Sequence, residues 1–198
     1  MTAILVGHSW GGHLAMHIAS AQPARVQGLL LLDALGAVGD GGAGTMESVI
    51  RGRIGEAASR AYGALESHED LDEDERGSRQ LALLWPGYFK DPAAAPPAPP
   101  LTLHALGASV MTDALRLLDE GALKTALPIL DVPSLHLIGR HSPIEPSANQ
   151  RTAALMQGAS VEIQDAGHFA WLEHPGSVAA AFRRLRQSIA QREDRQNG

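Results

Sequence analysis

The most constraining feature of this sequence is a serine between a short apolar strand and a helix, close to the first residue. Residues 4–6 are Ile, Leu and Val, residues 7–11 read Gly-His-Ser-Trp-Gly, and a helical pattern follows. The pentapeptide matches G-x-S-x-G, in which the serine occupies a sharp turn from strand to helix. We expect side chains at positions 7 and 11 to collide with neighbouring elements, so glycine is required at both. The turn would present the Ser9 hydroxyl at a helix N-terminus, which favours negative charge.

The residues after this turn predict a second strand parallel to the first. A helix is expected over residues 11–21, before Pro23, and residues 26–32 form a nearly unbroken apolar run that ends at Asp33. Such a run is typical of a strand buried on both faces of a parallel sheet. Strand, helix and strand within about thirty residues form a βαβ unit, which predicts an α/β fold.

The character of the sequence changes between residues 41 and 127. The apolar periodicity predicts three amphipathic helices, over residues 45–65, 73–84 and 108–119. The acidic run 67–75 is interpreted as a solvated face or a helix start, and the proline-dense run 92–100 as an extended connector that does not pack.

Two short segments of this region allow a functional interpretation. Residues 39–44 match G-x-G-x-x-G, but the following pattern is helical rather than a strand that ends in an acidic residue, so a hinge fits better than a nucleotide site. Residues 84–89 contain Trp85, Tyr88 and Phe89. These aromatic residues either pack the helical layer on its base or form an apolar wall over Ser9, and the sequence leaves both open.

Sheet character returns after this region. The expected elements are strands over 133–139 and 160–164, helices over 147–157 and 175–190, and a Gly-His loop at 167–168. In this arrangement the chain resembles the α/β-hydrolase superfamily, especially capped members that are proline-iminopeptidase-like or esterase-like. The resemblance rests on G-x-S-x-G, on the histidine loop before the last helix, and on the chain order serine, acid, histidine. It implies a partial α/β-hydrolase fold, a parallel sheet flanked by helices, with core residues 1–40 and 128–198 and a helical cap inserted over 41–127.

The resemblance also implies a set of site residues. Ser9 would be the nucleophile, His168 the general base, and the backbone N–H of Trp10 a donor to the oxyanion. A serine at the elbow argues against epoxide or haloalkane hydrolysis, for which this superfamily uses a carboxylate there. The implied function is hydrolysis of a small ester or amide through an acyl-enzyme intermediate, without a cofactor or a metal.

The acid of the site has two candidates. Family members commonly carry an aspartate after the penultimate strand, where this chain has Ser142. Others carry it after the strand that follows the elbow helix, which is the position of Asp33, at the carboxyl end of its strand. We predict Asp33 and keep Glu145, three residues beyond Ser142, as the alternative. Asp131 stands at the wrong end of its strand.

Composition excludes several classes of function. The net charge of −6 and the pI near 5.8 argue against nucleic-acid binding. The chain has no cysteine, so disulfides and thiolate chemistry are absent. No apolar run reaches membrane-spanning length and no signal peptide is recognised, which predicts a cytoplasmic protein. The hydrolase resemblance implies a small-molecule substrate. His13 and His17 have i, i+4 spacing, but Leu14 stands where a zinc-peptidase motif carries glutamate.

The family sheet has several strands before the elbow strand, and this sequence begins almost at that strand. We therefore expect residues 3–7 to form an open apolar edge. Either the chain continues upstream of Met1, which we favour, or a second copy (a homodimer) or a partner chain covers this edge. The loop that supplies the second oxyanion donor would also be missing, and losing one such donor lowers turnover about a hundred- to a thousand-fold. The alternative function is therefore an impaired or inactive hydrolase remnant that binds a ligand or a partner.

Overall fold

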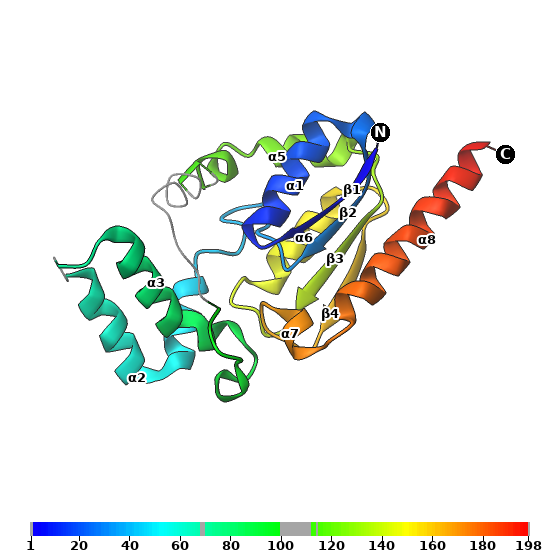
Figure 1. Ribbon diagram of the computed structural model, residues 1–198. Helices are drawn as coiled ribbons and strands as arrows, with labels where there is room; N and C mark the ends of the chain where they lie inside the picture. The colour runs from blue at the N-terminus through cyan, green and yellow to red at the C-terminus, as the bar shows by residue number, and fades with distance from the viewer. Residues whose placement is uncertain (1, 68–69, 100–111, 114, 198) are drawn as a thin grey trace.

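The fold has three layers, with a parallel sheet between two layers of helices (Figure 1). The computed structural model describes residues 2–67, 70–99, 112–113 and 115–197. The sheet has the order β1-β2-β3-β4 and consists of β1 (Ala3–His8), β2 (Val26–Leu32), β3 (Ser134–Gly139) and β4 (Ser160–Gln164). All neighbouring pairs are parallel. The α/β fold class and the four predicted strands are thus confirmed.

The helices cover both faces of the sheet because β2 is apolar on both sides. Leu29 and Leu31 pack into a cluster with α1, whereas Leu30 and Leu32 pack into a second cluster with α8. The helices around the sheet are α1 (Trp10–Ala21), α5 (Ala122–Ala126), α6 (Pro146–Leu155), α7 (Ala170–Glu173) and α8 (Ser177–Asn197). Because the strands are parallel, their carboxyl ends lie at one edge of the sheet, which the two helix layers leave open.

The predicted cap contains two helices that pack side by side and lie apart from the sheet (Figure 1). They are α2 (Met46–Glu66), in which Gly55 interrupts the helix with φ 82°, and α3 (Glu73–Leu84). The predicted helix over 108–119 lies partly outside the described residues, and residues 112–113 and 115–119 are helical. The division between core and cap at residues 40 and 127 stays a prediction.

Short 3-10 turns connect the longer elements, and one of them lies in the proline-dense run. The 3-10 turns within the described residues are η1 (Pro23–Arg25), η2 (Trp85–Tyr88), η3 (Pro92–Ala94) and η4 (Leu127–Ile129). The proline-dense run was expected not to pack, but the Trp85 indole N–H donates to the carbonyl of Pro96 at 2.7 Å. None of residues 92–99 is buried, so the run is a connector that makes this contact. A buried indole needs an acceptor, and an extended proline-rich backbone offers free carbonyl groups.

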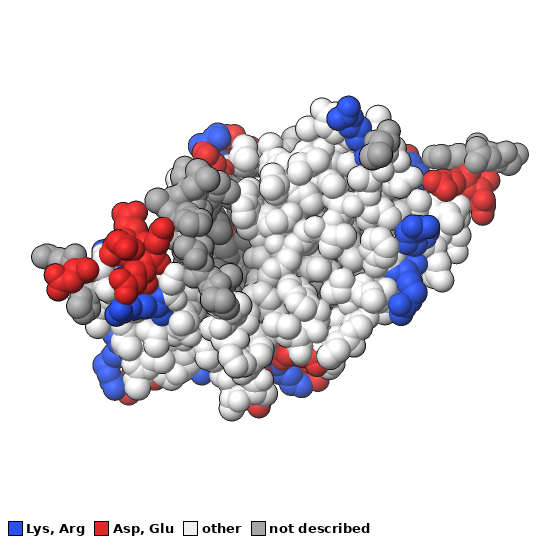
Figure 2. Space-filling model, in the orientation of Figure 1, with Lys and Arg blue, Asp and Glu red and all other residues white. Residues whose placement is uncertain are grey.

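Strand β1 lies at one end of the described sheet and pairs only with β2. Val6 is 51% exposed, and residues 2–24 contain no charged side chain. Figure 2 shows a broad uncharged surface over this part of the molecule. The open apolar edge expected over residues 3–7 is therefore present, and what covers it stays a prediction. No helix within the described residues is long and apolar enough to cross a membrane.

Candidate active site

Ser9 occupies a strained turn between β1 and α1. Its φ of 54° and ψ of −124° lie in a region that residues other than glycine rarely adopt. The turn is tied to the end of β2, because the Ser9 N–H donates to the carbonyl of Leu32 at 3.1 Å and its carbonyl accepts from the Leu35 N–H at 2.9 Å. These bonds fix the serine beside the segment that carries Asp33.

The glycines around this turn behave differently from the prediction. A Cβ at Gly7 would lie 2.3 Å from the carbonyl oxygen of Gly11, so glycine is required there as expected. A Cβ at Gly11 would meet nothing within 4 Å, and the prediction for that position is wrong. The second close approach is at Gly12, where a Cβ would lie 2.4 Å from Cβ of Ala34. Gly11 faces open space, whereas Gly12 faces the chain that leaves β2.

Asp33 is buried at the end of β2 and accepts three hydrogen bonds. Its Oδ1 accepts from the N–H of Gly139 at 3.1 Å, and its Oδ2 accepts from the hydroxyl of Ser142. Nδ1 of His168 lies 2.5 Å from the same Oδ2. A carboxylate can only accept, so His168 donates from Nδ1, and its Nε2 is left with a lone pair when the ring is neutral. That tautomer is the one a general base needs.

Ser142 stands where, by the resemblance, family members commonly carry the acidic aspartate. Its hydroxyl donates to Asp33 and accepts from the backbone N–H of Ile144 at 3.0 Å. Glu145, the alternative acid, is exposed and directs its carboxylate toward Ser147 and Arg151. The structure therefore brings Asp33, and not Glu145, to His168.

The backbone of His168 is held by two residues that the sequence analysis did not assign to the site. Its N–H donates to the carbonyl of Tyr88 at 2.8 Å, and its carbonyl oxygen accepts from Nε2 of His8 at 3.1 Å. Burial and the nearby His168 lower the pKa of His8 to about 3, so His8 is a neutral donor. His8 is the variable residue before the serine in G-x-S-x-G, a position whose pattern gives no signal of this role.

The aromatic segment 84–89 packs on the histidine loop, defined here as residues 165–169. Phe89 stacks on Phe169 with ring centroids 5.7 Å apart, and Tyr88 stacks on the imidazole of His168 at 5.5 Å. Burial raises the pKa of the Tyr88 hydroxyl. Of the two interpretations left open, packing describes Phe89, whereas Tyr88 also touches a predicted site residue.

Ser9 lies near this pair without a hydrogen bond to it. Within the described residues, its Oγ has no hydrogen-bond partner, and the side chain is partly exposed. The ring of His8, the preceding residue, is centred 4.4 Å from the ring of His168. All three predicted site residues therefore lie at the carboxyl edge of the sheet. Trp10 begins α1, where a backbone N–H has no acceptor within the helix and is free for an oxyanion.

The remaining sequence candidates have structural partners. Nδ1 of His13 donates to the carbonyl of Gly36 at 3.1 Å, which leaves its Nε2 to accept from Nε2 of His17 at 3.3 Å. Among the described residues, no group of three or more His, Cys, Asp or Glu side chains is arranged to hold a metal ion. The two histidines are therefore explained by packing and hydrogen bonding.

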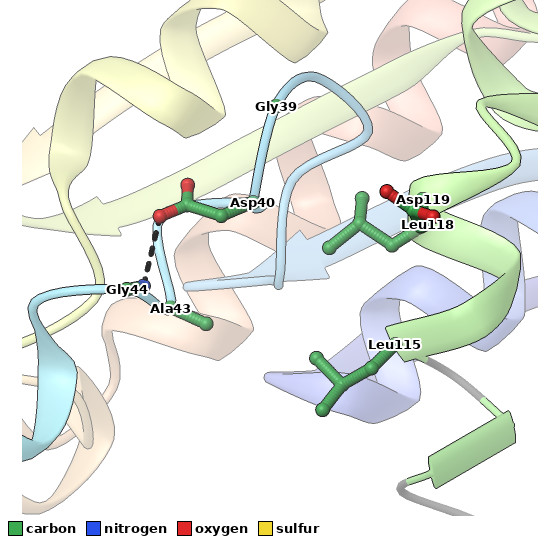
Figure 3. Close-up of a pocket in the computed structure, with 7 residues that line it drawn as sticks. All are labelled: Gly39, Asp40, Ala43, Gly44, Leu115, Leu118 and Asp119. Atoms are coloured by element: carbon green, nitrogen blue, oxygen red, sulfur yellow. Dashed lines mark hydrogen bonds between the residues drawn. The ribbon is translucent and has the colours of Figure 1, made fainter.

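The glycine-rich loop borders a cavity of about 470 Å³ (Figure 3). Leu115 and Leu118 line its opposite side, and none of the predicted catalytic residues contributes to it. The carboxylate of Asp40 accepts from the backbone N–H groups of Gly42 and Gly44, at 2.8 and 2.9 Å. Because a phosphate would need those donors, the loop is better explained as a self-capped turn than as a nucleotide site.

A serine elbow, a buried carboxylate and a histidine at one edge of a parallel sheet are the architecture of an α/β hydrolase. The chain belongs to the family described as "Alpha/beta hydrolase family", whose model matches residues 2–181. It is therefore an enzyme of the hydrolase class. The recognition made from the sequence is confirmed.

Three proteins illustrate the similarity. A "Pimeloyl-[acyl-carrier protein] methyl ester esterase" from Xanthomonas campestris pv. campestris is 31% identical over 192 residues, which cover 92% of this chain and 70% of that protein. A protein of the same description from Stenotrophomonas maltophilia is 33% identical over 193 residues, with 91% and 67% covered. The structure of a proline iminopeptidase from Mycobacterium smegmatis has a TM-score of 0.60 at 16% identity, covers 96% of this chain and 67% of its own, and shows the fold alone.

Proposed function

We propose that this chain hydrolyses carboxylic esters with Ser9 as the nucleophile, His168 as the general base and Asp33 as the acid. The observation that carries the proposal is the 2.5 Å contact between Asp33 and Nδ1 of His168, which joins residues 135 positions apart beside a serine elbow. An unassisted serine hydroxyl is almost fully protonated at neutral pH, so attack needs a base oriented in this way.

The proposed reaction follows from these roles. Nε2 of His168 removes the proton of Ser9 as Oγ attacks the ester carbonyl carbon, and the N–H of Trp10 stabilises the oxyanion. The intermediate collapses as His168 protonates the departing alcohol. Water, activated by the same imidazole, then releases the acid and restores Ser9. Asp33 stays ionised and stabilises the imidazolium.

The proposed substrate class is a methyl ester of an acyl group. The curated relatives at 31–33% identity are described as methyl ester esterases that act on a pimeloyl group on acyl-carrier protein. For this reason we propose methyl esters, rather than amides, as the preferred substrates. Comparing the hydrolysis rates of a free acyl methyl ester and of the same ester on a carrier protein tests whether the carrier is part of the substrate.

Labelling with a fluorophosphonate probe tests the proposal directly. We expect one label per chain, located on Ser9 by peptide mass spectrometry and abolished in Ser9→Ala and His168→Ala. The matched control is His141→Ala, because His141 is an exposed histidine that pairs with Asp165 outside the proposed triad. Its labelling should equal that of the wild type. An unlabelled wild-type chain that still binds an acyl methyl ester would instead support the alternative function, a binding protein.

A further inference from the structure

The histidine loop is in direct backbone contact with the last residues of the aromatic segment. A Cβ built at Gly167 would lie 2.3 Å from the carbonyl oxygen of Tyr88 and 2.8 Å from the backbone nitrogen of Lys90. The N–H of His168 donates to that same carbonyl. No side chain fits between the two segments, and the hydrogen bond links the peptide unit of His168 to Tyr88.

One carboxylate joins these two segments from the side. Oε2 of Glu173, in the short helix α7, accepts from the N–H of Gly167 at 2.6 Å. Oε1 of the same residue accepts from the N–H of Lys90 at 3.0 Å. Both bonds are assisted by the negative charge of the carboxylate, and such bonds are about twice as strong as neutral ones. A bidentate carboxylate also fixes the relative position of the two donors.

A cation from α2 also contacts the aromatic segment. The guanidinium of Arg53 donates to the carbonyl of Gly87 at 3.1 Å. Burial lowers the pKa of Arg53, and the nearby Glu173 opposes that shift. Arg53 thus partly balances the charge of Glu173 and attaches α2 to the segment that Glu173 holds.

We propose that Glu173 is a positioning residue for His168, acting by fixing the histidine loop to residues 87–90. The inference rests on the proposed function of His168 as the general base. Asp33 sets the orientation of the imidazole ring of His168, and His8 and Tyr88 hold the backbone of His168. Glu173 fixes the position of the segment that contains Tyr88 relative to Gly167. Removing the carboxylate breaks both hydrogen bonds and lets the two segments move relative to each other, without changing a reacting atom.

Steady-state kinetics on an ester substrate test the effect on the reaction. Since a misplacement of about 1 Å reduces turnover by about a hundred-fold, we expect Glu173→Ala to lower kcat between about ten- and a hundred-fold and to change KM less than about three-fold. Glu173→Gln keeps one acceptor oxygen and should lie between alanine and wild type. The matched control is Asp165→Asn, which removes an exposed charge that joins the same segments through Lys90 Nζ at 2.5 Å and should leave kcat unchanged.

Hydrogen exchange of single amides, followed by NMR, provides a readout that does not depend on activity. The amides of Gly167 and Lys90 should exchange at least ten-fold faster in Glu173→Ala and at the wild-type rate in Asp165→Asn. Unchanged exchange together with unchanged kcat would overturn the inference, as would an equal change in both variants. If alanine prevents folding, Glu173→Gln decides by the same two measurements. A wild-type chain that fluorophosphonate does not label would refute the proposed function. In that case, unchanged amide exchange in Glu173→Ala would by itself refute the proposed link that Glu173 makes between the histidine loop and residues 87–90.

Discussion

The sheet region and the predicted cap of this molecule are each stabilised by a different kind of interaction. At the carboxyl edge of the sheet, Asp33 and His168 are at most 3% exposed, and both are held by backbone groups as well as by each other. In the predicted cap, the ion pairs of α2 and α3 join exposed side chains one helical turn apart, such as Glu56 with Arg60 and Glu75 with Arg79. Figure 2 shows acidic side chains gathered at the far end of the α2–α3 pair.

This difference separates buried residues that fix the geometry of the site from exposed residues that contribute little to it. Buried polar groups are costly unless their hydrogen bonds are complete, so changes near Asp33 should have large effects. Exposed ion pairs contribute at most about 1 kcal/mol, so changes in α2 and α3 should have small ones. The segment 85–90 is an exception to this division. It lies within the predicted cap in the sequence, but its backbone bonds to His168 and Glu173, so changes there should have large effects.

The largest expected effect comes from the carboxylate at the end of β2. Asp33→Asn should lower kcat for ester hydrolysis by about 10³–10⁴-fold, because the amide cannot hold His168 in the tautomer of a base or stabilise its charge. Glu145→Gln is the control and should change kcat less than two-fold, since Glu145 contacts Ser147 and Arg151 instead. The reverse order of effects would move the acid to the later loop.

A second test compares packing at the elbow with packing elsewhere. Gly12→Ala places a Cβ 2.4 Å from Cβ of Ala34, and overpacking of this kind destabilises a core by about 1–3 kcal/mol. Gly11→Ala is the control, because its Cβ would meet nothing within 4 Å. Urea denaturation should show a lower free energy of unfolding for Gly12→Ala only. Equal losses in both variants would contradict the assignment of Gly12 as the close approach.

The sequence predicted the core better than the site around it. The apolar run of β2 and the amphipathic pattern of α8 each follow from burial, which is a local property of the sequence. Asp33 could be named because strand ends of a parallel sheet share one edge. Its donor Ser142 was noticed only as a missing aspartate, since no pattern shows that a hydroxyl will replace a carboxylate as a partner.

The contacts that the sequence could not reveal are those between distant backbone groups. Tyr88 reaches His168 through its carbonyl, a group that every residue carries, and Glu173 acts on two backbone N–H groups. The choice of Gly11 over Gly12 failed for a related reason. The motif names the glycines by spacing, whereas the collision depends on which side of α1 faces Ala34.

A third test uses the buried histidine of β3. His136 is fully buried, and burial lowers its pKa from 6.5 to about 4. Between these pH values the unfolded chain binds more protons than the folded chain, so the free energy of unfolding falls as the pH falls from about 6.5 to about 4. His136→Leu should reduce this slope by at most about 1.4 kcal/mol per pH unit.

Urea denaturation of wild type and His136→Leu from pH 4.5 to pH 8 checks this prediction. The series at pH 7.5–8, where the ring is neutral in both states, provides the reference for packing effects. A slope between pH 6.5 and 4.5 that is the same in both proteins would show that His136 does not carry the acid sensitivity. His8 and His13 have pKa values lowered to about 3 and about 4, so part of the slope should remain in the variant.

The smallest expected effect is a gain of stability in α2, within the predicted cap. Gly63 lies inside α2, and a Cβ there would meet nothing within 4 Å. Gly63→Ala should raise the free energy of unfolding by about 0.5–1 kcal/mol, because alanine loses less backbone entropy in a helix than glycine does. Gly55→Ala is the matched control in the same helix, and its φ of 82° should make that variant less stable. A gain at Gly63 without any change in kcat would show that α2 can be stabilised while the acid–base pair stays in place, as expected if segment 85–90 is the part of the described cap residues that contacts His168.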